Sequence, residues 1–173
     1  MYITKVCSKH NIEFKQYNSL SKCPKCRQVK KRVTNKLKPK TKKQQANERK
    51  KLRKKCDILW SKLIKIRAGF KSEYSGTTEG LNSHHIYSKS NYATRWDLDN
   101  GCCLTSGEHT LSSKFSAHKT PVEFLEWIKK RRGQEWYEGL RIRARDHFDW
   151  DKLEEVYLYL KSEYDKLESS QQT

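Results

Sequence analysis

Four potential metal ligands in the first 28 residues constrain how this chain can fold more than any other feature. They form two pairs, Cys7-x-x-His10 and Cys23-x-x-Cys26, with twelve residues between the pairs. Tetrahedral zinc needs four such ligands, and its binding can contribute on the order of 10 kcal/mol of apparent folding free energy. Because so short a segment cannot build its own hydrophobic core, we predict a zinc ribbon over residues 1–28 with one structural zinc ion.

Two other interpretations of these cysteines are possible. The first is that they are unrelated thiols beside a surface histidine. The second is a thioredoxin-like redox pair, which is disfavoured because no βαβ pattern surrounds Cys23 and Cys26. The chain holds six cysteines, and its first residues, MYITKVCSKH, lack the apolar core of a secretory signal. We therefore expect reduced thiols and a cytoplasmic location.

The charge of the chain favours a polyanionic partner. The formal net charge is +18, and charged residues are as frequent as hydrophobic ones, at 34% each. Such a field attracts nucleic acid, with an anionic membrane surface as the rival. No run of about 18 apolar residues exists, so we expect no membrane span. We predict DNA as the partner, keep RNA open, and expect the ribbon to contact DNA or to dock a protein.

A basic tract, residues 29–55, follows the ribbon. It begins with VKKRVTNKLKPKTKK, which we interpret as a flexible linker, and turns helical near Thr41. One apolar stripe at spacings of three and four extends this helix to a cap at Gly69. The stripe consists of Leu52, Cys56, Leu59, Leu63 and Ile66. The remaining helix surface is basic. One interpretation is a helix that packs on the domain with this face solvated, and the other, compatible with it, is that the exposed face also follows phosphates. The predicted nucleic-acid contacts here are Lys30, Lys31, Arg32, Lys50, Lys51, Arg53 and Lys54.

Residues 56–173 have the mixed pattern of a folded domain that ends in three helices. The first begins at Thr120-Pro121, a side-chain cap followed by a proline, and ends at Gly133. The segments EWYEGLRIRARD and WDKLEEVYLYLKSEYDKL predict the second and third helices. The third carries a stripe of Leu153, Val156, Leu160 and Tyr164.

Chemistry-bearing side chains gather in one short segment of this domain. They are the pair His84-His85, then Asn100, then His109. Imidazole takes up protons near neutral pH and binds metals when neutral. The simpler alternative is chance, since a single histidine is more often a structural residue than a ligand.

The order and spacing of these residues, with RWDLDNG before His109 and SAHKTPVEFLEWI after it, resemble the HNH endonucleases. The resemblance extends over roughly residues 56–147 and is strongest to phage-encoded proteins related to the NinG recombination protein. It implies an α+β fold with a small ββα-metal core, a hairpin followed by a helix, surrounded by further helices. It also implies metal-dependent hydrolysis of DNA phosphodiester bonds, in the host cytoplasm if the gene is phage-borne.

The resemblance also implies a role for each motif residue. His85 becomes the general base, Asn100 holds the loop that orients it, and His84 and His109 bind one catalytic divalent cation. His84 replaces the more usual aspartate, which favours Mn, Ni, Co or Zn over Mg without excluding Mg. His118 is a weaker candidate ligand, because its distance from His109 is not a helical i,i+4 spacing. Neighbouring side chains of a strand point to opposite sides, so a local bend must bring His84 and His85 into one site.

Two further expectations concern the surroundings of this motif. We predict that Lys89 and Arg95 contact nucleic acid and that Trp96 packs in the core. Many HNH proteins brace the hairpin with zinc on two Cys-x-x-Cys pairs, where this chain has Ser72-x-x-Ser75 and Thr105-x-x-Glu108. Because all four thiols are missing together, we predict that ordinary packing replaces the zinc. The remaining cysteines are interpreted as small buried residues, namely Cys56, Cys102 and Cys103.

The predicted activity is nicking of DNA by a monomer, because one such site cuts one strand. Three other functions stay open. The chain can be a non-catalytic zinc-ribbon nucleic-acid-binding protein, a recombination or assembly factor on an HNH fold, or an RNA-processing or translation-linked factor. A metal-dependent product separates the enzyme from the first two, and competition between DNA and RNA separates the last.

Overall fold

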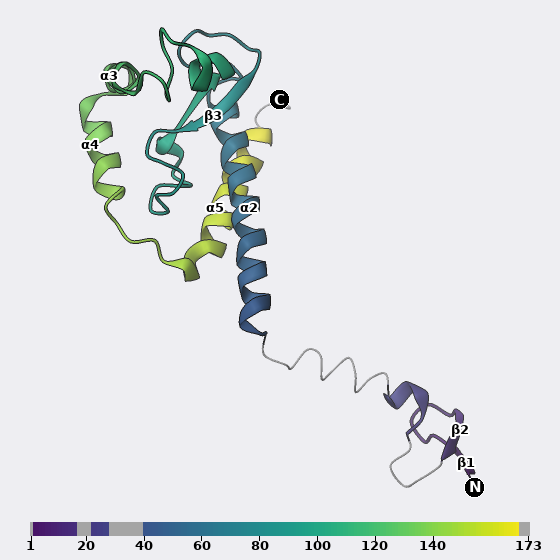
Figure 1. Ribbon diagram of the computed structural model, residues 1–173. Coiled ribbons are helices and arrows are strands. Elements are labelled where there is room, and N and C mark those ends of the chain that lie inside the picture. The colour runs from purple at the N-terminus through teal and green to yellow at the C-terminus, as the bar shows by residue number, and fades with distance from the viewer. Residues whose placement is uncertain (1, 17–21, 28–39, 170–173) are drawn as a thin grey trace. The chain divides into compact units, whose positions relative to one another are not determined.

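The structure, a computed structural model, describes residues 2–16, 22–27 and 40–169 and has an α+β composition of helices and two small sheets (Figure 1). The chain forms two compact units, Met1–Gln45 and Ala46–Thr173. Three of the predicted nucleic-acid contacts, Lys30, Lys31 and Arg32, lie outside the described residues. Within the described ranges, no helix is long and apolar enough to cross a membrane.

The first unit is built on a two-stranded hairpin. Strand β1, Ile3–Val6, pairs antiparallel with β2, Glu13–Gln16, and residues 24–27 are helical. All four side chains of β1 are exposed. Among the described residues of this unit only Cys23 is buried, at 1% exposure. The hairpin therefore packs on no apolar core of its own within the described ranges.

The long helix α2, Lys42–Arg67, begins and ends where the sequence signals predict. Thr41 and Gln44 form a reciprocal capping box, in which each backbone N–H bonds the other side chain. Gly69, at a φ of +62°, lies in the left-handed conformation of a C-terminal cap. The predicted domain boundary between residues 55 and 56 falls inside this helix. Lysine and arginine are good helix formers, so the basic stretch continues as one helix into the domain, as predicted.

Helix α2 buries a wider face than the predicted stripe. Cys56 and Leu63 are fully buried, as predicted, but so are Trp60 and Ile64 on the adjacent side of the helix. The other residues of the predicted stripe are only partly buried, namely Leu52, Leu59 and Ile66. A single stripe does not predict the second side, because α2 packs against two partners.

The second sheet is the hairpin of β3, Leu81–His85, and β4, Gly101–Thr105, which follows the short 3-10 helix η1, Leu98–Asn100. His84 pairs with Cys102, and His85 pairs with Gly101. A Cβ atom on Gly101 would lie 2.0 Å from Cδ1 of Ile64, so α2 packs directly on the backbone there. A five-residue π-helix, η2, Gly107–Leu111, follows β4 and carries His109.

Three helices complete the second unit at the predicted places. They are α3, Pro121–Arg132, α4, Gln134–Arg143, and α5, Leu153–Ser169, with the 3-10 helix η3, Trp150–Lys152, before α5. Helix α4 ends three residues before its predicted segment does, and α5 begins three residues after its own. Leu153 and Leu160 of the predicted stripe are buried. The expected cap at Thr120 is different: its hydroxyl bonds the backbone of Ser116 and not the first turn of α3.

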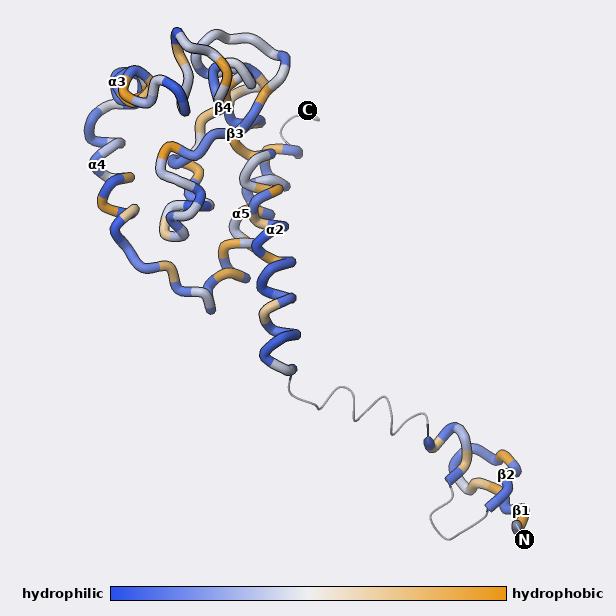
Figure 2. The backbone as a smooth tube through the Cα atoms, viewed as in Figure 1, coloured by the Kyte–Doolittle hydropathy of each residue, from blue (hydrophilic) through white to orange (hydrophobic). Residues whose placement is uncertain are grey.

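Two apolar clusters lie on opposite faces of the β3–β4 hairpin. Cys103 belongs to the cluster built with α2 and α5, and its neighbour Cys102 belongs to the cluster built with α3. Adjacent residues of a strand point to opposite faces, so one hairpin is covered on both sides. The predictions that Cys56, Cys102 and Cys103 are buried and that Trp96 packs in the core are confirmed. In Figure 2 the apolar residues of this unit are spread over β4, α3, α4, α5 and the second half of α2, while β3 is mostly hydrophilic.

Candidate functional site

The four ligands predicted in the first unit converge on one point. The sulfur atoms of Cys7 and Cys26 lie 3.9 Å apart. The Nδ1 atom of His10 lies 3.4 Å from the sulfur of Cys23 and 3.5 Å from that of Cys26. With Zn–S bonds of about 2.3 Å, two sulfurs on one tetrahedral zinc ion are about 3.8 Å apart. All four ligand atoms lie within 4.8 Å of one another, so this cluster could hold a structural zinc ion.

The ligand atoms lie close enough to form hydrogen bonds with one another, and these bonds shift the pKa values of the thiols. The side-chain hydrogen bond with Cys23 lowers the pKa of Cys7 to about 6 and raises that of Cys26 to about 11. The backbone N–H of Cys26 also donates to the sulfur of Cys23, at 3.4 Å. A bound zinc ion deprotonates a coordinating thiol outright, so the cation would take the place of the thiol protons in these hydrogen bonds.

A second cluster of possible ligands, all histidines, lies at the end of the β3–β4 hairpin. It joins His84 of β3, His109 of η2 and His118 of the following loop, with ligand atoms within 4.8 Å of one another. The Nε2 atoms of His109 and His118 are 3.3 Å apart. Two imidazole nitrogens bound tetrahedrally at about 2.05 Å from one ion are also about 3.3 Å apart. This group of three histidines could therefore hold a metal ion.

His118 was expected to be a weak candidate, and the structure corrects that expectation. The loop after η2 folds back onto it: the N–H of Ala117 donates to the carbonyl of Glu108, and that of His118 to the carbonyl of His109. The hydroxyl of the buried Ser116 also donates to the carbonyl of His109, at 3.1 Å. A helical spacing rule could not detect this contact, because a turn in the backbone and not a helix brings the two histidines together.

Burial keeps the hairpin histidine of this cluster neutral. His84 is 7% exposed and packs its ring edge-on against Phe124, at 5.0 Å between ring centres. This burial, with smaller contributions from the neighbouring histidines, lowers the pKa of His84 to about 3. Burial also lowers the pKa of His109. Neutral imidazoles present the free lone pair that a metal ion requires.

His85 lies beside this cluster but is held differently. Its ring stacks on the indole of Trp60, with centres 3.8 Å apart and planes 12° from parallel. Its Nε2 lies 2.9 Å from the backbone carbonyl of Arg95. Because a carbonyl only accepts, Nε2 carries the proton and Nδ1 is left as the acceptor. Burial lowers the pKa of His85 to about 4, so the ring is neutral at pH 7.

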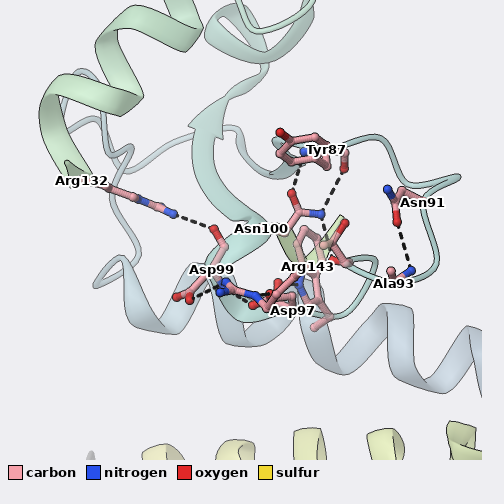
Figure 3. A network of polar contacts seen from close by, with 10 residues as sticks. Tyr87, Asn91, Ala93, Asp97, Asp99, Asn100, Arg132 and Arg143 are labelled. Atoms are coloured by element: carbon pink, nitrogen blue, oxygen red, sulfur yellow. Dashed lines mark hydrogen bonds and ion pairs between the residues drawn. The ribbon is translucent and has the colours of Figure 1, made fainter. Parts of the chain in front are cut away.

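Asn100 holds the loop that supplies this carbonyl (Figure 3). The side chain is fully buried; its Oδ1 accepts from the N–H of Tyr87, and its Nδ2 donates to the carbonyls of Tyr87 and Thr94. One amide thus ties both ends of the loop that leads to Arg95. The predicted link from Asn100 to the position of His85 runs through backbone contacts in this geometry.

Arginines from α3 and α4 fasten the chain just before Asn100. Arg143 pairs with Asp97 at 2.7 Å and with Asp99 at 3.0 Å. Arg132 donates to the carbonyl of Asp99, at 3.1 Å (Figure 3). The C-terminal helices thereby position the turn that enters β4, a function that their sequence patterns did not indicate.

Among the predicted nucleic-acid contacts that lie in the described ranges, Arg95 is the one that is buried. Its side chain is 9% exposed, and its guanidinium forms two hydrogen bonds with the carboxylate of Asp57, at 2.9 and 2.8 Å. Trp96 donates to the same carboxylate, at 2.9 Å. Burial alone would raise the pKa of Asp57, but the bonds from Arg95 and Trp96 outweigh it and lower that pKa. Arg95 therefore anchors the loop to α2. Its charge is paired within the protein, where a phosphate contact was predicted.

The other predicted basic contacts of the second unit differ in exposure. Lys50, Lys51 and Lys54 are exposed along α2. Arg53 is partly buried and donates to the hydroxyl of Tyr92, at 3.0 Å. Lys89 keeps a 57% exposed side chain, 3.7 Å from Asp57.

A groove of about 730 Å³ opens over the histidines. His84, His85, His109 and His118 all line it, so the end of β3 brings two adjacent side chains to one site, as the motif requires. Lys89 lines the same groove and contributes a positive charge. Aromatic side chains form part of the wall, including Tyr87 and Tyr137, whose hydroxyls are 3.3 Å apart.

The four positions without thiols do meet in space, but through hydrogen bonds. The hydroxyl of Ser72 donates to the carboxylate of Glu108, at 2.5 Å, and the N–H of Thr105 donates to the same oxygen, at 2.8 Å. Ser72 in turn accepts from the N–H of Ser75, at 3.3 Å. The contact between these two turns is therefore polar, where the prediction named only ordinary packing. A buried polar network, with Ser72 at 4% and Glu108 at 8% exposure, joins these two turns.

A comparison of the chain with known protein families, curated proteins and solved structures found no match.

Proposed function

We propose that this chain is a metal-dependent endonuclease of the HNH type that hydrolyses phosphodiester bonds of DNA. The observation that carries the proposal is the convergence of His84, His109 and His118 beside His85 in one open groove. Histidines kept only for structure do not need to bring three ring nitrogens within 4.8 Å of one another. The hairpin followed by the short helix η2 is the part of the fold that we assign to the ββα-metal core.

The residues of the groove have distinct proposed roles. His84, His109 and His118 would hold the divalent cation, which supplies charge to neutralise a phosphate oxygen and the departing oxyanion. His85, with its proton fixed on Nε2 by the carbonyl of Arg95, would take a proton from water at Nδ1. An anionic phosphate close to His85 raises the pKa of that imidazole from its buried value and so strengthens the base.

The remaining parts of the chain fit delivery of this site to DNA. Lys89 at the groove and the lysines of α2 would neutralise phosphates, a kind of contact that gives affinity without reading sequence. The cluster of Cys7, His10, Cys23 and Cys26 would hold zinc to fold the first unit. One groove cuts one strand, so we propose nicking as the reaction of a monomer.

The direct test is conversion of supercoiled plasmid to open circles with Mn²⁺ as the added cation. Replacement His85→Ala removes the proposed base, so cleavage should fall by at least about 100-fold while binding stays within a few fold. His147 is exposed and outside the groove, so His147→Ala is the matched control and should cut at the normal rate. An active His85→Ala enzyme would contradict the assigned base.

The second candidate function is a non-catalytic recombination or assembly factor that binds DNA on the same fold. The observation in its favour is the low pKa of His85, about 4, which makes the free imidazole a weak base. DNA binding without any product in Mn²⁺, Ni²⁺, Co²⁺, Zn²⁺ or Mg²⁺ would support this candidate over the enzyme.

A further inference from the structure

The first turns of α2 are exposed on every side. Each side chain from residue 42 to residue 51 is exposed, and Cys56 is the first buried residue of the helix. In Figure 1 these turns extend past the end of α5, the helix that packs alongside α2, and in Figure 2 they are almost entirely hydrophilic. We call residues 42–55 the basic arm.

Before Leu52 the basic arm has no apolar stripe that could pack against protein. The apolar stripe of α2 begins at Leu52, and its continuation toward the N-terminus meets Gln45 and Glu48 in place of apolar residues. The arm contains eight basic residues and one acidic residue. Basic side chains three and four positions apart repel one another along a helix, so neutralising partners stabilise it.

The basic charges of the arm are not confined to one stripe. Arg49 lies 4.0 Å from Asp151 of η3, and Lys55 lies over the ring of Tyr157 of α5, so these two face the rest of the second unit. At about 100° per residue, the five lysines of the arm other than Lys55 cover about half of the circumference, and the first and last of them in angle lie on opposite sides of the helix. They are Lys42, Lys43, Lys50, Lys51 and Lys54. A helix lying on one phosphate backbone needs charges on one face only. A helix between two phosphate backbones needs them on both sides.

The major groove of B-form DNA supplies that arrangement. It is about 12 Å wide and has phosphates along both walls, and an α-helix with its side chains is about 10–12 Å across. A-form RNA has a deep, narrow major groove that does not admit a helix. The capping box of Thr41 and Gln44 starts the helix from within its own sequence, so the arm needs no tertiary contact to begin.

We infer that the basic arm is a duplex-DNA-binding element that enters the major groove and carries phosphate contacts on both of its sides. The inference deepens the proposed function by naming the form of nucleic acid and the element that binds it. It does not require that the histidine groove cuts DNA.

The test measures binding alone, with full-length zinc-loaded protein that carries His85→Ala so that cleavage does not enter. Lys50→Gln, Lys51→Gln and Lys54→Gln are combined in one variant, since glutamine keeps the helix propensity of lysine at these exposed positions. The control variant removes the same charge from η3 and α5, through Lys152→Gln, Lys161→Gln and Lys166→Gln. Fluorescence anisotropy compares a DNA duplex with an RNA duplex of the same sequence over a range of salt concentrations.

The arm variant should lose about tenfold or more in affinity for the DNA duplex, and its salt dependence should flatten by about 2.7 units of log K per log salt. The control should lose far less, and the RNA duplex should bind more weakly than DNA and respond less to the arm variant. If the arm variant and the control variant lost equal affinity for the DNA duplex, net charge alone would explain the effect and the inference would be overturned. Equal losses on DNA and RNA would overturn groove entry, and preference for RNA would overturn the assignment to DNA. If the wild-type protein does not cut plasmid DNA, these binding outcomes are unaffected. The proposal of DNA hydrolysis and the proposal of groove binding by the arm can therefore fail independently.

Discussion

The two units of this chain arrange potential metal ligands for opposite purposes. In the first unit the cluster of three cysteines and a histidine contains Cys23, the only buried residue among those described there, so the ligands take the place of a core. In the second unit two apolar clusters already cover both faces of the β3–β4 hairpin, and the histidine cluster lies at its end. Metal binding would therefore fold the first unit, whereas in the second unit the metal would bind to a hairpin that already has a core.

The largest effect is expected when a metal ligand of the first unit is removed. Cys23→Ser removes the buried ligand, and loss of zinc should remove on the order of 10 kcal/mol of apparent folding free energy from this hairpin. The amide resonances of β1 and β2 should collapse to unfolded positions, while those of residues 46–169 stay in place. Lys25→Ala, between the two cysteines of the pair, should leave zinc content and spectrum unchanged. A folded hairpin in Cys23→Ser would remove the contrast between the units.

A core substitution should show that the second unit depends on apolar packing. Trp60 is 2% exposed, packs in the cluster with α2 and α5, and stacks on His85. Trp60→Ala should cost about 3–5 kcal/mol in the free energy of unfolding, measured by urea denaturation of the second unit's transition. Ile58→Ala, on the same helix at 49% exposure, should cost less than about 0.5 kcal/mol. Similar costs for the two variants would contradict the described core.

A smaller effect is expected from the polar network that joins the turns at Ser72 and Thr105. Glu108→Gln weakens its hydrogen bonds and should cost about 1–3 kcal/mol. Burial alone would raise the pKa of Glu108, but hydrogen bonds from Ser72, Ser75 and Thr105 outweigh it and lower that pKa. The contribution of Glu108 is therefore full above the unfolded-state pKa of about 4.3 and is lost as pH falls through the lower folded-state value.

Urea denaturation at several pH values checks this sign. The stability difference between wild type and Glu108→Gln should be constant at neutral pH and shrink in acid. Glu126→Gln, at an exposed position of α3, serves as the control and should change stability by less than about 0.5 kcal/mol. A difference that grows in acid would contradict the ionised carboxylate in the network.

Features with a local signature in the sequence were predictable, and long-range contacts were not. The helix ends at Gly69 and Gly133 follow from glycine as a helix terminator, and the burial of Cys102 and Cys103 follows from their small apolar side chains. The ion pair of Arg95 joins residues 38 positions apart, and no periodicity reports such a pair. Charge alone therefore placed Arg95 among the phosphate contacts.

The histidine site shows the same division between local and long-range information. His84, His109 and Asn100 were predicted as site residues because their order and spacing resemble a known motif. His118 reaches the site only through the backbone bonds of the loop with Glu108 and His109, a turn that has no helical spacing to detect. The polar network at Glu108 was missed because the absence of thiols says nothing about which hydrogen bonds replace them.

Titration with a paramagnetic cation tests most directly the claim that the histidine cluster of the second unit holds a metal ion. Mn²⁺ binding, followed by electron paramagnetic resonance in zinc-loaded full-length protein, should reveal one site that His118→Ala weakens by at least about tenfold. His147→Ala should bind Mn²⁺ normally, and both variants should keep the wild-type unfolding free energy of the second unit within about 0.5 kcal/mol, because these histidines are exposed. Equal Mn²⁺ affinity in wild type and His118→Ala would contradict a cation held by converging imidazoles.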